Sequence, residues 1–74
     1  MKTKTISVEA ATSQQRVEDA QCDYSYKHDT VAEAKRDARR VLTDDYQRSV
    51  EASEPLWYAR VMVDGDCVAD FFRR

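Results

Sequence analysis

Apolar and polar residues alternate in two stretches of the first third of the chain. Over residues 3–9, Ile6 and Val8 fall on one side of an extended backbone, and polar residues dominate the other side. Over residues 20–27, a cysteine and two tyrosines take alternate positions. Alternation that involves β-branched and aromatic residues predicts half-buried strands, and we expect these two to pair as a hairpin. The polar residues 10–19 between them form a loop or one weak helical turn.

A helical pattern occupies the middle of the chain. From Val31 onward, apolar residues recur at the spacing of an amphipathic helix. Asp29 or Thr30 can cap it, and Thr30 begins a T-x-x-E capping box. Proline is excluded from a helix interior and also disfavours a helical backbone at Glu54, so we expect the helix to end by about Ser53, before Pro55. Asp45 interrupts the apolar stripe, and we expect one long helix with an irregularity near Thr43. The alternative is that the helix kinks or restarts there, with Thr43 as a new cap.

Two apolar runs near the C-terminus flank the dipeptide Asp64-Gly65. This dipeptide predicts a type I′ turn and a β-hairpin, because both central residues of that turn need φ > 0. With a two-residue loop, Val61 is expected opposite Val68. One face of the hairpin then carries Trp57, Val61, Val63, Val68 and Phe72, and the other carries Leu56, Tyr58, Met62 and Phe71.

One of these two faces has no helix to cover it. A single helix shields only one side of a sheet, and an exposed apolar patch above roughly a few hundred Å² usually marks an interface. Asp66 and Asp70 share the side of Trp57 and are costly to bury in a dry core, so we expect that side to be open. It is predicted to bind a target protein, or a second copy of the chain in a homodimer. The alternative is that residues 10–19 fold over it.

Length and composition set the fold class. The 74 residues allow a single domain, residues 1–74, with a thin core. The element order β-β-α-β-β predicts an α+β fold, in which a four-stranded, mainly antiparallel sheet has one long helix packed on one face. The first residues do not resemble a secretory signal, and no apolar run reaches the length of a membrane span. We therefore expect a protein of the host-cell cytoplasm that does not bind membranes.

The sequence carries no motif for catalysis, cofactor binding or metal binding. Its single glycine, Gly65, is used in the hairpin turn, which excludes glycine-rich phosphate-binding loops. Cys22, Cys67 and His28 lack the paired spacing of a zinc site. A cysteine–histidine nucleophile would also need a third group to orient it. We expect no enzyme activity, no cofactor and two free thiols, with a disulfide between the cysteines as the alternative.

Charged residues form two flanks on the polar side of the predicted helix. The simplest interpretation is a solvated surface with intrahelical pairs such as Asp37 with Arg40 and Asp44 with Arg48. A functional interpretation is that the acidic flank contacts a basic protein surface or imitates the charge of nucleic acid. The basic flank would instead follow phosphates. The candidate partner-binding residues are Glu33, Asp37, Asp44, Glu51, Trp57, Val61, Val63 and Phe72, and the alternative nucleic-acid-binding residues are Lys35, Arg36, Arg39 and Arg40.

Size, acidity and element order give the chain a resemblance to a known group. A helix segment such as TVAEAKRDA, followed by a terminal aromatic hairpin such as LWYARVMVDGDCV, resembles those of small phage-encoded anti-CRISPR proteins. The resemblance implies a non-enzymatic inhibitor that occupies a guide- or DNA-binding surface of a CRISPR effector, and it transfers no individual binding residue. The predicted function is inhibition or modulation of a host protein complex, such as a CRISPR effector. The alternative is a small nucleic-acid-binding or regulatory module that uses the basic flank.

Overall fold

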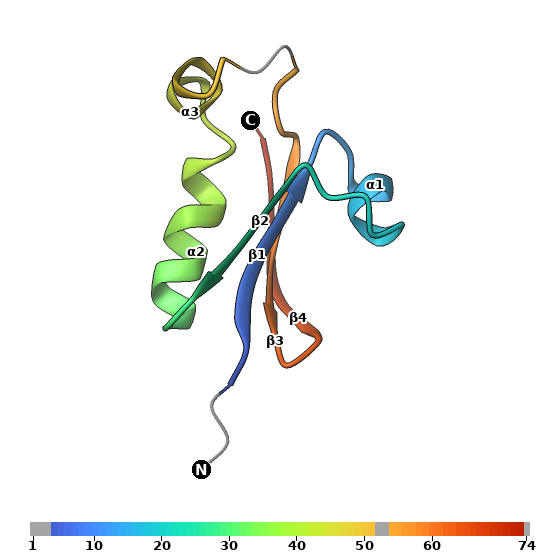
Figure 1. Ribbon diagram of the computed structural model, residues 1–74, viewed down its shortest axis with the longest axis vertical. Coiled ribbons are helices and arrows are strands. Elements are labelled where there is room, and N and C mark those ends of the chain that lie inside the picture. Colours follow the sequence, from blue (N-terminus) through green and yellow to red (C-terminus); the bar gives the residue numbers. More distant parts are fainter. Residues whose placement is uncertain (1–3, 52–53, 74) are drawn as a thin grey trace.

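The computed structural model describes residues 4–51 and 54–73 of the chain. A four-stranded antiparallel sheet has the spatial order β2-β1-β3-β4, and helices lie on both sides of it (Figure 1). The α+β class and the antiparallel sheet are therefore as predicted. The strands are β1 (Ile6–Ala11), β2 (Tyr24–His28), β3 (Tyr58–Val63) and β4 (Asp66–Phe72), and the helices of the described part are α1 (Gln14–Glu18), α2 (Val31–Arg40) and α3 (Asp44–Ser49).

The expectation of one long helix was wrong, and the alternative of a restart was right. Helix α2 ends at Arg40, and Thr43 adopts an extended backbone with φ −97° and ψ 156°. Its hydroxyl donates to the Arg40 carbonyl oxygen at 2.7 Å and accepts from the Tyr46 amide at 3.2 Å. A threonine that bonds backward and forward in this way ends one helix and caps the next. Thr30 caps α2 as predicted, because its hydroxyl accepts from the Glu33 amide at 3.1 Å.

The main core lies between α2 and one face of the sheet. Ala34 and Ala38 of α2 are fully buried, as are the valines Val8 and Val61, which pair across β1 and β3. The small alanine side chains allow the helix to approach the sheet closely. Burial of each valine contributes on the order of 1.5–3 kcal/mol, so this contact is the main source of the fold's stability.

The C-terminal hairpin turns where predicted, with φ 51° at Asp64 and 90° at Gly65. Its register differs from the expectation after the first two pairs, Val63 with Asp66 and Met62 with Cys67. A β-bulge lies between Val61 and Met62, so that Val61 pairs with Ala69 and Val68 has no partner. One extra residue moves every later side chain of β4 to the other face.

Two features correct the predicted faces of the hairpin: α2 packs on the side of β3 that was expected to be open, and the bulge shifts the side chains of β4. Val61 is fully buried under α2 and Val63 packs partly against the same core, so neither lies on an open face. Phe72 pairs with Tyr58 rather than with Trp57. Phe72 and Trp57, which were assigned to one face, therefore belong to opposite sides of the sheet.

Helix α1 covers part of the face that α2 leaves open. Val17 of α1 is 1% exposed and packs with Ala11 and Tyr58 in a second, smaller cluster. The middle of this face is polar, since Arg60 on β3 donates to Glu9 on β1 at 2.8 Å. Residues 10–19 do cover one end of the sheet, but on the side of Tyr58, so the alternative that they fold over the Trp57 side was wrong about the face. The side that α2 leaves open is less apolar than the predicted open face.

Candidate functional site

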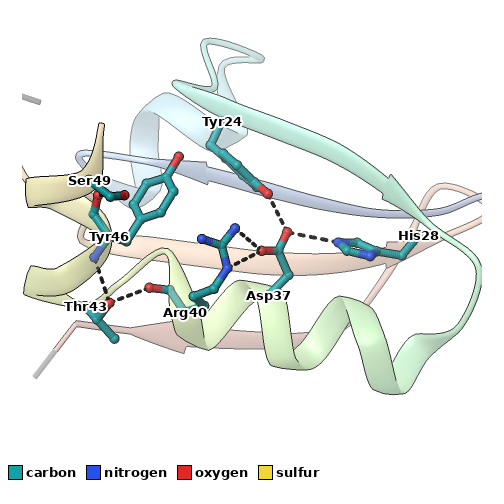
Figure 2. A network of polar contacts seen from close by, with 7 residues as sticks. All are labelled: Tyr24, His28, Asp37, Arg40, Thr43, Tyr46 and Ser49. Carbon is teal, nitrogen blue, oxygen red and sulfur yellow. Dashed lines mark hydrogen bonds and ion pairs between the residues drawn. The ribbon is translucent and has the colours of Figure 1, made fainter. Parts of the chain in front are cut away.

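A buried carboxylate joins α2 to the edge strand β2 (Figure 2). Oδ2 of Asp37 lies 2.5 Å from the Tyr24 hydroxyl and 2.9 Å from Nε2 of His28. Oδ1 accepts from Nε and Nη2 of Arg40 at 3.1 and 2.7 Å. Both carboxylate oxygens are thus occupied by groups of the same chain, and Asp37 is only 7% exposed.

The surroundings of Asp37 determine the protonation of its carboxylate and of the Tyr24 phenol. Burial by itself raises the pKa of Asp37, but the hydrogen bonds from Tyr24, His28 and Arg40 outweigh burial and leave the pKa below its usual value. Burial and the bond to Asp37 raise the pKa of Tyr24. The carboxylate stays ionised and the phenol stays protonated, which suits a fixed clamp between β2 and α2.

The sequence interpretation missed this clamp and placed Asp37 on a solvated acidic flank, which was wrong. The signal was present, because Asp37 lies three residues after Ala34 and four before Val41, on the apolar face of the helix. The predicted pair of Asp37 with Arg40 does form. Asp44 pairs with Arg73 rather than with Arg48, and Arg48 pairs with Asp45.

The other predicted acidic residues do not form one stripe with Asp37. Glu33 is exposed in the first turn of α2, and Glu51 is exposed after α3. Asp44 is exposed at the start of α3, where its carboxylate meets Arg73. The acidic set is therefore divided between a buried clamp, the two ends of the helical layer and a contact with the C-terminal hairpin.

The predicted basic residues also separate into different environments. Arg40 reaches toward β2, pairs with Asp37 and lies 5.0 Å from the ring centroid of Tyr46. Arg39 reaches toward the opposite strand, where its guanidinium lies 5.0 Å from the ring centroid of Phe71 in β4. Lys35 lies one turn earlier, four residues before Arg39. Arg36 is exposed on the outer side of α2.

A groove runs between the C-terminal part of α2 and β4. It has a volume of about 630 Å³ and has both basic and acidic residues in its lining. The lining residues are Arg39, Leu42, Thr43, Asp44, Asp70, Phe71, Phe72 and Arg73. Since β4 is an edge strand of the described sheet, the groove follows a free strand edge. We call this region, made of β4 from Val68 to Phe72 together with the groove, the β4 edge surface.

Arg73 closes one end of the groove. Its side chain is 10% exposed, donates to the Leu42 carbonyl oxygen at 3.2 Å and forms the ion pair with Asp44. Its guanidinium also lies 5.7 Å from the ring centroid of Trp57. Arg73 thus ties the junction of α2 and α3 to the end of the hairpin.

The thiols and acidic groups do not assemble into a metal centre. Cys22 and Cys67 are free thiols in the structure, as the default prediction had it. Within residues 4–51 and 54–73, no three histidine, cysteine, aspartate or glutamate side chains are grouped to hold a metal ion. Over the same residues, none of the helices has the length and apolar character needed to cross a bilayer.

Comparisons with protein-family models, with curated proteins and with solved structures gave no match. The function is therefore inferred from the geometry and charge of the residues described above.

Proposed function

We propose that the protein is a non-enzymatic inhibitor or modulator that binds a host protein complex through its β4 edge surface. The observation that carries this proposal is the position of the exposed large apolar side chains. Val68 is 50% exposed and Phe72 59% exposed, and both lie on β4. Trp57, at 49%, immediately precedes the neighbouring strand β3 and lies on the opposite side of the sheet from Phe72, so exposed apolar side chains occur on both sides near this edge. Single exposed apolar residues are ordinary on a protein surface, whereas a group of them beside an open strand edge favours a binding site.

A CRISPR effector is the proposed target within this class. Support comes from the resemblance of the chain to small anti-CRISPR proteins in size and in its terminal aromatic hairpin. Inhibitors of this kind work by occupying a surface. The clamp at Asp37 is consistent with such a role, because its groups hold the scaffold together rather than facing a substrate.

Capture of the tagged protein's partners from the native host, followed by mass spectrometry, tests this proposal. The informative variant is Val68→Ser/Phe72→Ser, and its matched control is Val50→Ser/Tyr26→Ser, whose side chains are 49% and 58% exposed away from β4. We expect the wild type and the control to retain the same partner and the β4 variant to lose it. Retention by both variants would contradict the proposed surface. Recovery of nucleic acid without protein would contradict the proposed function.

A nucleic-acid-binding module is the second candidate, and one observation favours it. Lys35, Arg36 and Arg39 form no ion pair within the described residues, so their charge is open to an external anion. A mobility shift with duplex DNA at two salt concentrations tests it. Binding that weakens steeply with salt and is lost in Arg36→Glu/Arg39→Glu would favour this candidate. Arg40 is a poor site for such a test, because its loss disturbs the clamp on Asp37.

A further inference from the structure

The geometry points to an extended acidic peptide segment of the partner protein as the occupant of the β4 edge surface. The segment adds a strand to β4 and turns carboxylates toward Lys35 and Arg39 of α2. This inference rests on the proposed function, because it names the chemistry of the partner that the same surface binds. Three observations carry it: the unpaired backbone of β4, the groove beside it and the charge of the helix flank.

The backbone of β4 offers hydrogen-bonding groups that no other described strand uses. The Arg73 amide donates to the Trp57 carbonyl oxygen at 2.9 Å, so the backbone of Arg73 faces β3. Antiparallel ladders alternate between residues that face the neighbour and residues that face away. The N–H and C=O groups of Asp70 and Phe72 therefore face outward, two residues apart. That spacing is the one at which an added strand bonds to an edge.

The flank of α2 beside this edge is positively charged. Arg39 lies over Phe71, and Lys35 is four residues earlier on the same side of the helix. Like charges at this spacing repel one another. Among residues 4–51 and 54–73, neither side chain has a carboxylate partner. Carboxylates from a bound segment would neutralise both charges.

The two faces of β4 determine which side chains of the bound peptide should be acidic and which apolar. Phe71 faces α2 and the groove, whereas Asp70 and Phe72 face the other side of the sheet, because they pair with Arg60 and Tyr58. Side chains of an added strand also alternate between these sides. The segment therefore places acidic residues on the α2 side and apolar residues on the side of Phe72, which is 59% exposed.

Other occupants fit less well. A nucleic acid carries negative charge along its whole length and would bring phosphates against the exposed carboxylates of Asp66 and Asp70 on β4. A peptide strand whose side chains alternate places its carboxylates on the α2 side alone, away from the side of Asp70. The second free edge, β2, lacks the same combination, because the α2 side chains beside it are held in the clamp of Asp37 with Arg40. The acidic peptide is the occupant that uses the backbone edge and the cationic flank together.

Fluorescence anisotropy with a labelled peptide tests the inference. The probe has about ten residues in which glutamate alternates with valine, and the control peptide has lysine at each glutamate position. We expect binding that weakens with salt, and an affinity for the lysine peptide lower by about tenfold or more. An unbound glutamate peptide, or equal binding of the two peptides, would overturn the inference.

Two protein variants separate the backbone from the charge. Asp70→Pro removes an outward N–H from β4, and its matched control Ser25→Pro changes an exposed, outward-facing position of β2. Lys35→Glu/Arg39→Glu reverses the flank without touching the ladder, and Arg36→Glu is its control on the outer side of α2. We expect each test variant to weaken glutamate-peptide binding by about tenfold and each control by less than about twofold. Urea unfolding checks that each variant is folded. If Asp70→Pro does not fold, the binding of Lys35→Glu/Arg39→Glu alone tests the inference.

The remaining outcomes are distinct from one another. Preferential binding of duplex DNA that Lys35→Glu/Arg39→Glu abolishes would identify nucleic acid as the occupant and overturn the inference. Self-association of the wild type that Asp70→Pro abolishes would identify a second copy and overturn it as well. A host partner that Val68→Ser/Phe72→Ser loses but Lys35→Glu/Arg39→Glu retains would leave the proposed function standing and overturn the acidic segment alone.

Discussion

The hydroxyl oxygen of Tyr24 lies 2.5 Å from Oδ2 of Asp37, and this hydrogen bond joins an edge strand to the helix that covers the sheet. Asp37 is the one charged residue buried in the described part of the molecule. His28 and Arg40 complete its contacts. A buried charge with every partner in place holds the helix at a fixed position on the sheet, and loss of a single partner leaves the charge poorly compensated.

Removal of the Tyr24 hydroxyl tests the contribution of the clamp to stability. Tyr24→Phe keeps the ring, whose centroid lies 5.9 Å from that of Tyr46 in an edge-on contact. We expect the free energy of unfolding in urea to fall by about 1.5–3 kcal/mol, as is typical for a hydrogen bond to a charged group. Tyr26→Phe on the same strand is the control, because its side chain is 58% exposed and its loss should cost less than about 0.5 kcal/mol. Equal losses in the two variants would contradict the clamp.

Asp37 makes stability depend on pH in acid. Burial raises the pKa of Asp37, but the hydrogen bonds from Tyr24, His28 and Arg40 lower it by more. The pKa in the folded protein therefore lies below the ordinary value of 3.8. The unfolded chain therefore takes up this proton more readily than the folded chain. The stabilisation is complete above pH 3.8 and is lost as the pH falls through the folded pKa. Between pH 5 and about pH 2, the free energy of unfolding in urea should fall more steeply for the wild type than for Asp37→Asn. Parallel pH profiles of the two proteins would contradict the assignment of this pH dependence to Asp37.

The hairpin turn needs glycine at position 65 because of the backbone conformation there, and not because a side chain would clash with its neighbours. Gly65 has φ 90°, and a Cβ built on it meets nothing within 4 Å. Gly65→Ala is therefore expected to lower the free energy of unfolding by about 1–2 kcal/mol through strain in the left-handed region, without any clash. Gly65→Asn should lose less, because asparagine tolerates this region better. A larger loss for asparagine than for alanine would show that side-chain contacts, rather than φ, set the cost.

Helix α1 protects one thiol, and this protection can be measured. Val17 is 1% exposed, and the half-buried Cys22 packs against the cluster that contains it. Burial and the nearby Glu9 raise the pKa of the Cys22 thiol, which slows its reaction with disulfide reagents. In a Cys67→Ser background, Val17→Ala should lower the free energy of unfolding by about 1–2 kcal/mol and accelerate the reaction of Cys22. Val50→Ala, at a side chain that is 49% exposed, should leave the rate unchanged.

Local signals in the sequence predicted the parts of the fold that local chemistry decides. The Asp64-Gly65 turn, the Thr30 cap and the alternating strands each follow from residues close together in the chain. The break at Thr43 was recognised only as an alternative, because a cap and a continuous apolar stripe compete at that position. The hydroxyl of Thr43 decides it by bonding to backbone groups on both sides.

The site could not be assembled in the same way, because it depends on pairing across the sheet. Arg39 becomes part of the β4 edge surface because its guanidinium lies over Phe71, a residue 32 positions later in the chain. Phe71 faces α2 only because the bulge shifts the register of β4. An extra residue reverses the faces of the residues after it, and the sequence of β4, DCVADFF, has no regular alternation that would mark where the reversal occurs. The spacing of the helix places Asp37 on its apolar face, but its partners Tyr24 and His28 belong to strand β2. The sequence of the helix alone therefore does not identify them.

The bulge at Val68 adds one residue to β4 without changing which of the paired residues lie on each face of the sheet. Val68 is the residue that has no partner, and pairing resumes with Ala69 opposite Val61 and Asp70 opposite Arg60. A chain without Val68 would join these pairs to Met62 and Cys67 in an unbroken ladder, with every other side chain on its present side. The pairs on either side of the bulge therefore form without any contribution from a partner of Val68. A change there alters the profile that the strand edge presents and leaves the core as it is.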